Sequence, residues 1–169
     1  MKSLFRLFVT LCLVISSSLA SAAPVKLHWH QLIPEEHRED TLALIKSTMN
    51  PYIHKDGVVA PQRVNDTLKT TVDTFNGQQI AIRGYMVPLD ADERGIFTLM
   101  LAPFAGACIH VPPPPPNQLI YIELAEGEIL PWEAYSSPIE IRGVIQTEQI
   151  DGEMAMTSYT IKGADFSLL

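Results

Sequence analysis

The sequence contains few cysteines, since only Cys12 and Cys108 occur among its 169 residues. Cys12 lies in an N-terminal stretch that we expect to be removed, which leaves Cys108 without a partner in its own chain. Exported proteins usually hold their cysteines in disulfide pairs. The shortage excludes an intrachain disulfide in the mature chain and a Cys-x-x-Cys redox motif. Cys108 is therefore reactive, metal-bound, buried or paired between chains.

Long apolar runs are also missing at the N-terminus. Lys2 and Arg6 precede a short apolar stretch, residues 7–15, and small residues follow as far as Ala22. This order is typical of a secretory signal peptide, and the stretch is shorter than a membrane-spanning helix requires. We expect residues 1–22 to be a signal peptide cleaved after Ala22, giving a periplasmic protein with no stable membrane insertion. Cys12 lacks the sequence context of a lipid anchor.

Positive charge is scarce. The chain has 12 Lys and Arg against 19 Asp and Glu, and loss of Lys2 and Arg6 with the signal peptide changes its net charge from −7 to −9. Binding of nucleic acid requires a cationic surface, so a nucleic-acid partner is excluded. The 147 residues left after cleavage are enough for one domain with its own core.

The first part of the mature chain predicts helices. A helix is expected to begin at Pro34 and to end at Asn50-Pro51, because proline suits the first turn and acidic residues follow it. Apolar residues at spacings of three and four predict a second helix from about Val64 to Phe75. We therefore expect residues 23–76 to form an N-terminal helical segment packed on the rest of the protein.

From residue 77 onward the sequence predicts strands, because β-branched and aromatic residues alternate with polar ones. Asp151-Gly152 is expected to form a hairpin turn between the last two strands. The predicted fold is α+β, with residues 77–169 forming a small OB-like five-stranded antiparallel β-barrel. The five expected strands span residues 80–87, 96–101, 118–124, 139–146 and 154–161.

The pattern Ile-x-Ile-Arg-Gly occurs twice, at residues 80–84 and 139–143. A glycine within a strand permits the sharp coiling that a small closed barrel requires. Arg83 and Arg142 alternate away from the isoleucines and are expected to be solvated at the barrel surface. A paired basic site is the alternative interpretation.

Two Cys/His or His/His pairs have the residue types that bind transition metals. Cys108 and His110 share one face of an extended segment, and His28 and His30 repeat this spacing, with Trp29 facing the opposite way. Thiolate and imidazole are favoured zinc donors, and the two pairs together supply the four ligands of a tetrahedral site. The alternative is that His28 and His30 are surface residues that flank a buried Trp29.

Other residues extend or compete with this interpretation. Asp90 or Asp92 are further candidate donors, whereas His37 and His54 are expected to be exposed. A thiol nucleophile activated by His110 is a less favoured alternative, because no third orienting residue is evident.

Five prolines, residues 112–116, follow the Cys-x-His motif and hold polyproline II geometry. Such a tract cannot pair as an interior strand, so it lies on the surface or fills a groove. It either docks on a partner or forms a rigid loop that positions its neighbours.

Several of these motifs resemble the DUF3299 family of exported bacterial proteins. The resemblance rests on residues 84–90, on the run from Phe104 to Gln118, on the early Trp29-x-x-Leu-Ile-Pro and on the later Ile141-Arg142-Gly143. Cys108 and His110 fall on the family motif. The resemblance implies an accessory role beside ABC-type transporter components linked to zinc supply.

We therefore predict a periplasmic accessory protein that binds a transition metal, with zinc as the cofactor and Cys108, His110, His28 and His30 as ligands. ABC transporter components or another exported protein are the expected partners. The alternative is a non-metal protein-interaction module of the cell envelope, in which Cys108 and His110 are structural. A thiol-dependent enzyme is less favoured than either.

Overall fold

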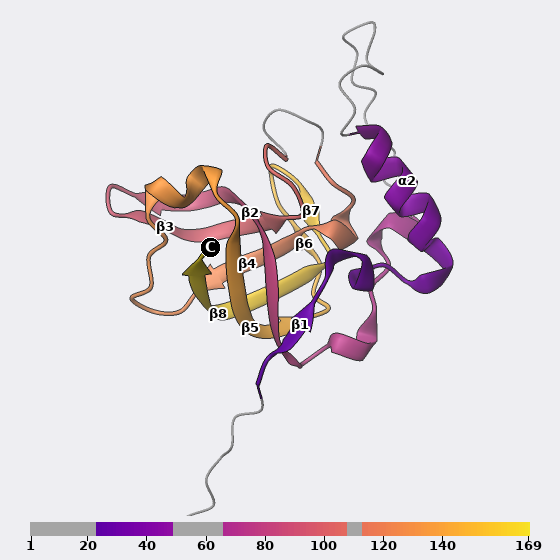
Figure 1. Ribbon diagram of the computed structural model, residues 1–169, viewed down its shortest axis with the longest axis horizontal. Helices are drawn as coiled ribbons and strands as arrows, with labels where there is room; N and C mark the ends of the chain where they lie inside the picture. The colour runs from indigo at the N-terminus through magenta and orange to yellow at the C-terminus, as the bar shows by residue number, and fades with distance from the viewer. Residues whose placement is uncertain (1–22, 49–65, 108–112) are drawn as a thin grey trace, which may run out of the picture.

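The computed structural model describes residues 23–48, 66–107 and 113–169 (Figure 1). Within these residues five strands close a barrel in which each strand pairs with the next and the last returns to the first. An additional short strand, β1 (Val25–Leu27), pairs with β2. In spatial order the barrel strands are β2 (Gln79–Asp92), β3 (Gly95–Ala102), β4 (Ile120–Leu124), β8 (Tyr159–Leu168) and β5 (Ile139–Gln146).

The barrel closes because β2 is long and bends at Gly84. Residues 79–84 of β2 pair with β5, and residues 85–92 pair with β3. A Cβ atom on Gly84 would lie 2.6 Å from the Ala102 carbonyl oxygen and 2.8 Å from Leu101 Cγ, so no side chain fits at this crossing. A Cβ on Gly143 would overlap Ile161 in the same way. Both repeated glycines therefore lie where the closed barrel leaves no room for a side chain, and their role in coiling the strands stays a prediction.

The five predicted strands are present, but the barrel is not antiparallel throughout. β4 and β8 pair in parallel, because the chain crosses from β4 through β5 before it forms β8. The fifth strand begins at Tyr159 rather than at residue 154. The preceding residues form a separate hairpin of β6 (Ile150–Asp151) and β7 (Met156–Thr157) around Gly152.

The core has two parts, because successive side chains of β3 point alternately into and out of the barrel. Leu99 and Leu101 point into the barrel with the other large aliphatic side chains. Met100 and Ala102 point outward and are nonetheless buried in a second cluster. Its other members come from β2 and from loops outside the barrel: Val87, Ala107 and Leu119, with Phe104 and Ala155 packed against them. One outer face of the barrel is thus covered.

The N-terminal segment consists mainly of short turns. A helix does begin after Pro34, as η2 (Glu35–His37) and then α2 (Arg38–Thr48), which confirms the predicted start, whereas the predicted end at Asn50-Pro51 lies outside the described residues. The helix predicted over residues 64–75 is wrong in its described part, which forms η4 (Asp66–Lys69) and η5 (Asp73–Phe75). Val72 between them is extended, because its amide donates a hydrogen bond to the Tyr159 hydroxyl (2.6 Å).

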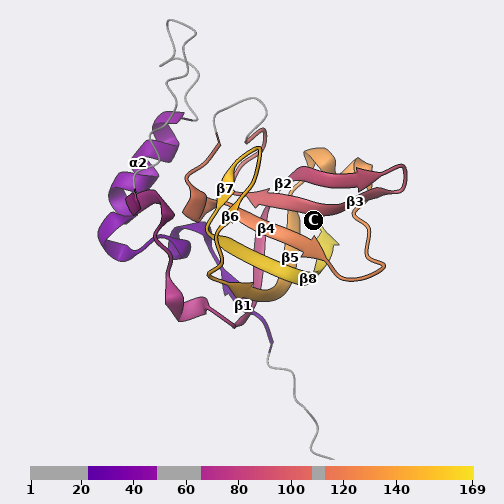
Figure 2. The same cartoon turned by 180° about the vertical axis from the view of Figure 1, so that it is seen from behind.

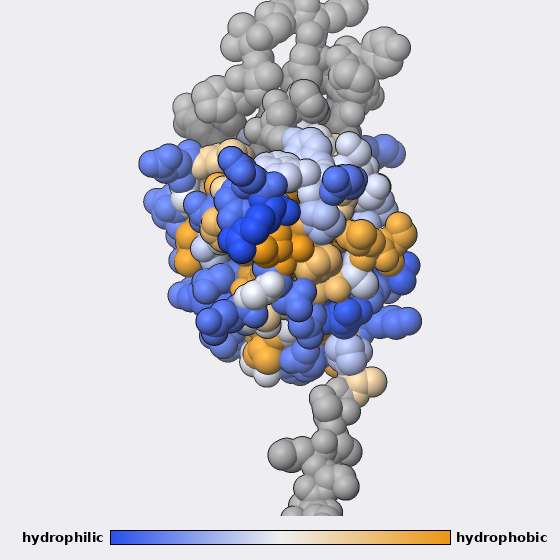
Figure 3. Space-filling view, turned by 90° about the vertical axis from the view of Figure 1, so that its left-hand side faces the viewer, coloured by the Kyte–Doolittle hydropathy of each residue, from blue (hydrophilic) through white to orange (hydrophobic). Residues whose placement is uncertain are grey.

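Two further 3₁₀ turns connect the barrel strands, η6 (Pro116–Gln118) before β4 and η7 (Trp132–Ser136) before β5. Figure 1 shows α2 to one side of the barrel and the β2–β3 hairpin at the opposite side. The face at the hairpin side is largely hydrophilic, with small groups of hydrophobic residues between the polar ones (Figure 3). Among the described residues, no helix has the length and apolar character of a membrane span.

Candidate functional site

Of the four predicted metal ligands, the structure describes His28 and His30. Cys108 and His110 lie outside the described residues. His28 and His30 are exposed at the start of η1 (Trp29–Leu32), and Trp29 between them is partly buried against the barrel core. The Trp29 indole N–H donates to the Arg83 carbonyl (2.7 Å). Trp29 is thus partly buried between two exposed histidines, as the alternative interpretation of this spacing expected.

The rings of His28 and His30 are stacked, with centroids 5.8 Å apart and planes 9° from parallel. An imidazole nitrogen binds a metal through a lone pair in the plane of its ring, so two stacked rings do not point at a common ion. Coordination by both would require one ring to rotate. The described residues contain no group of three or more His, Cys, Asp or Glu side chains placed to hold a metal ion. Zinc binding therefore remains a prediction.

The additional candidate donors lie elsewhere. Asp90 and Asp92 are in the part of β2 that pairs with β3, whereas β1 and the early histidines adjoin its opposite end. Asp92 is engaged by Arg94 (2.7 Å), and this hydrogen bond lowers the pKa of the Asp92 carboxyl. His37 is half-buried rather than exposed, and His54 lies outside the described residues.

Most of the polyproline tract is buried. Pro113 is exposed, but Pro114–Pro116 are buried beside the barrel. The Pro116 carbonyl accepts a hydrogen bond from the Ser158 amide (2.9 Å) just before β8. Pro114–Pro116 are thus packed within their own protein and lead into η6, so these three residues do not offer a free polyproline surface to a partner.

An apolar groove lies on the outer face of β2, β3 and β4, and the β6–β7 hairpin supplies its other side. Figure 2 shows this hairpin in front of the barrel strands. Met100 and Tyr121, which face each other across β3 and β4, form its floor. A bulge in β2 after Pro88 places Leu89 at one edge, where it is 37% exposed. The volume is about 300 Å³, and the hairpin side consists of Ile150, Gly152, Glu153, Met154, Ala155 and Thr157.

The groove combines desolvated polar groups with apolar walls. Burial, followed by the charges of Glu123 and Asp90, raises the pKa of the Tyr121 hydroxyl. The buried Thr157 hydroxyl has no hydrogen-bond partner among the described residues. Met154, on the hairpin, is 49% exposed. Sequence reasoning missed this site, although the outward-facing Met100 and the apolar residues around the Asp151-Gly152 turn were signals of it.

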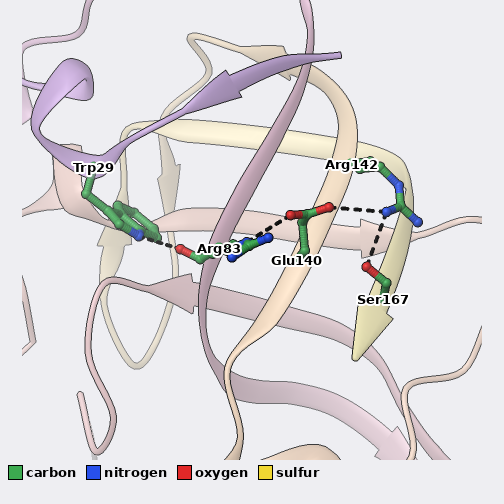
Figure 4. A network of polar contacts seen from close by, with 5 residues as sticks. All are labelled: Trp29, Arg83, Glu140, Arg142 and Ser167. Carbon is green, nitrogen blue, oxygen red and sulfur yellow. Dashed lines mark hydrogen bonds and ion pairs between the residues drawn. The ribbon is translucent and has the colours of Figure 1, made fainter. Parts of the chain in front are cut away.

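A second pocket, of about 230 Å³, lies between β1, η1, β2 and β5. Arg83 and Glu140 form its polar side through an ion pair between Nε and Oε2 (2.9 Å). Arg142 binds the other Glu140 oxygen (3.3 Å) and the Ser167 hydroxyl (3.2 Å), as Figure 4 shows. The two repeated arginines therefore meet at one carboxylate, which holds the pKa of Glu140 below its usual value chiefly through the Arg83 hydrogen bond.

This convergence was readable in part from the sequence. Glu140 occupies the variable position of the second Ile-x-Ile-Arg-Gly, two residues before Arg142 and on the same strand face. The register of β2 and β5 places it opposite Arg83. The two copies of the pattern lie side by side because of this strand register, which could not be predicted from the sequence.

These features define a closed five-stranded barrel with a mainly 3₁₀ and α-helical N-terminal segment and two surface pockets. The chain belongs to the family described as Protein of unknown function (DUF3299), which matches residues 29–167 and confirms the resemblance. Its structure is similar to the crystal structure of a DUF3299 family protein from Pseudomonas aeruginosa PAO1, with a TM-score of 0.64 and 27% sequence identity over 88% of this chain and 97% of that chain. The comparison with curated proteins finds no match.

Proposed function

We propose that the protein is a periplasmic accessory protein that binds another protein of the cell envelope through the groove beneath the β6–β7 hairpin. Export is supported by the charged, apolar and small-residue order of residues 1–22. The family resemblance supports an ABC-type transporter component as the partner. The single observation that carries the proposal is a groove of about 300 Å³ whose floor is apolar.

We also propose that the barrel is OB-like. Counted along the chain, the first barrel strand (β2) pairs with both the second (β3) and the fourth (β5), and the third (β4) is parallel to the fifth (β8). OB barrels bind their ligands on the face of strands two and three and with the loop between strands four and five. The corresponding surface here is β3, β4 and residues 147–158, which is where the groove lies.

The size and charge of the groove favour a protein side chain as its occupant. A volume of about 300 Å³ is at the lower limit for a drug-sized ligand, but it suits one large apolar side chain of a partner. Glu153 at the edge and the net charge of −7 favour basic residues around that side chain. Exposed Met154 gives the hairpin an adaptable contact surface.

The test compares charged substitutions inside and outside the groove. Leu89→Asp and Met154→Asp are expected to weaken binding to purified transporter components at least about tenfold, because a charge replaces apolar contact. Val144→Asp is the matched control, since Val144 is 39% exposed on β5 and does not line the groove. Biolayer interferometry measures the affinities. Equal affinities for all variants, or no binding of any component, would refute the groove as the interface.

A second candidate function is zinc binding through Cys108, His110, His28 and His30 in support of the transporter. The exposed imidazoles of His28 and His30 lie close together, with centroids 5.8 Å apart, so that rotation of one ring would let both face one ion. Native mass spectrometry of protein purified without reductant or chelator tests it, with Cys108→Ala and His28→Ala variants. Stoichiometric zinc that both variants lose supports the four-ligand site. Zinc retained at unchanged affinity in both variants would rule it out.

A further inference from the structure

We infer that the pocket between β1, η1, β2 and β5 binds a small organic anion, a carboxylate attached to an apolar body. This site is separate from the groove of the proposed function. Its polar lining consists of Lys26, His28, Arg83 and Glu140, and its apolar lining consists of Leu27, Trp29 and Ala81. Both kinds of group thus face one volume of about 230 Å³.

The charge of the pocket favours an anion although the chain is acidic. Glu140 is the acidic residue of its lining, and both of its oxygens already accept bonds from Arg83 and Arg142 (Figure 4). The charged residues of the lining, Lys26, Arg83 and Glu140, together carry a formal charge of +1, in a chain whose net charge is −7. An isolated cationic pocket on an acidic protein selects small anions and disfavours extended polyanions.

The guanidinium of Arg83 has donors left for a ligand. Its Nε binds Glu140, whereas no hydrogen bond of its two terminal nitrogens is found among the described residues. Its side chain is 65% exposed. Two terminal N–H groups of one guanidinium match the two oxygens of a carboxylate. Glu140 fixes the orientation of this fork without occupying those groups.

The apolar lining of the pocket includes an aromatic ring that is held in place. The Trp29 indole is held by its hydrogen bond to the Arg83 carbonyl (2.7 Å) and lies close to Gly84, where a Cβ would be 3.0 Å from Trp29 Cζ2. A fixed aromatic ring next to a guanidinium provides stacking area at little entropic cost. This side of the pocket therefore favours an organic body over a bare inorganic ion.

The experiment uses benzoate as the anion, benzamide as its neutral analogue and inorganic phosphate as the ion without an apolar body. Two-dimensional ¹H–¹⁵N NMR of the purified protein follows the Trp29 indole N–H during each titration, with a chelator present to exclude metal effects. We expect saturable benzoate binding with a Kd of about 1 mM, as suits a ligand of this size. Benzamide and phosphate are expected to bind at least about tenfold more weakly.

Arg83→Gln and Lys26→Gln are expected to weaken benzoate binding at least about tenfold and about threefold, respectively. Arg94→Gln is the control, because it removes the same charge from an exposed ion pair at the β2–β3 turn. Lys26 is exposed in the short strand β1, so its variant tests the site even if Arg83→Gln disturbs folding. No benzoate-dependent shift of the Trp29 signal, or equal affinity in Arg94→Gln and Lys26→Gln, would overturn the inference. Phosphate binding as tight as benzoate binding would overturn the assignment of an organic ligand.

Discussion

Tyr159 is a fully buried polar link between the barrel and two parts of the N-terminal segment, so Tyr159→Phe is an informative single change. The Tyr159 hydroxyl donates to the Leu32 carbonyl (2.9 Å) and accepts from the Val72 amide (2.6 Å). Its side chain is fully buried in the barrel core. Phenylalanine preserves the ring and removes both bonds, which leaves one backbone acceptor and one backbone donor without their partner.

The expected loss of unfolding free energy is about 2–4 kcal/mol, because a buried backbone group left unpaired costs about 1–3 kcal/mol, and the Leu32 carbonyl is buried whereas the Val72 amide is half-buried. Urea denaturation followed by circular dichroism measures this loss. The substitution is expected to increase the rate of amide hydrogen exchange most at Val72 and at the residues next to it in the sequence. A loss below about 0.5 kcal/mol would refute the view that this hydroxyl anchors the N-terminal segment.

The same hydroxyl gives a pH test with a defined direction. Burial raises the pKa of Tyr159 to about 12 in the folded protein, from an ordinary value near 10. The folded state therefore favours the protonated form, and this contribution is complete below pH 10 and decreases as the pH rises from 10 to 12. The decrease amounts to about 2–3 kcal/mol. Tyr159→Phe is expected to remove this component of the alkaline destabilisation, and an unchanged alkaline profile would contradict the assignment.

Three further changes test the barrel by urea denaturation. Glu140→Gln is expected to destabilise the protein by about 1 kcal/mol at pH 7, because it removes the carboxylate that pairs with two arginines. Since the pKa of Glu140 is lowered in the folded state, the difference in unfolding free energy between Glu140→Gln and the unchanged protein should disappear as the pH falls below about 4.5. A difference that stays constant down to pH 3 would argue against a stabilising role of the Glu140 carboxylate. Gly84→Ala is expected to cost at least about 2 kcal/mol, because its Cβ meets backbone and core atoms; a neutral effect would show that β2 does not need its close crossing. Thr157→Val is expected to be neutral or stabilising by up to about 1 kcal/mol, since its hydroxyl is buried without a partner in the described structure, and a clear loss of stability would reveal a hydrogen bond to that hydroxyl.

The strands were predictable where a simple alternation holds. β5 spans residues 139–146 as predicted, because its isoleucines and Gly143 face inward and its polar residues face outward. β8 departs from such a pattern at Lys162 and Gly163, which are both exposed, so its continuation to Leu168 gave no clear signal. β2 continues past Pro88 only because a bulge accommodates a residue that lacks an amide donor.

The structure of the N-terminal segment and the two pockets could not be predicted from the sequence, because both depend on contacts between residues that are far apart in the chain. Leu68 and Phe75 have helical spacing, yet their segment is broken at Val72 by a hydrogen bond to a tyrosine 87 residues away. Pro114–Pro116 are buried, and the Pro116 carbonyl accepts a hydrogen bond from the amide of Ser158, which is distant in the sequence. Both contacts join residues that are far apart in the sequence, so no local sequence pattern predicts them. The groove likewise depends on β6–β7 lying over Met100 and Tyr121, which the register of β3 and β4 places together.

The repeated Ile-x-Ile-Arg-Gly pattern connects barrel closure to the anion pocket. Gly84 lacks a side chain at the place where β2 turns from β5 to β3, and Trp29 packs into that space. The preceding residue, Arg83, binds Trp29 through its carbonyl and Glu140 through its side chain. A bulkier residue at position 84 would therefore displace the tryptophan that forms the apolar side of the pocket as well as strain the barrel. If this coupling holds, Gly84→Ala will weaken benzoate binding even under conditions where the variant remains folded, whereas the loss of stability alone would leave the affinity of the folded fraction unchanged.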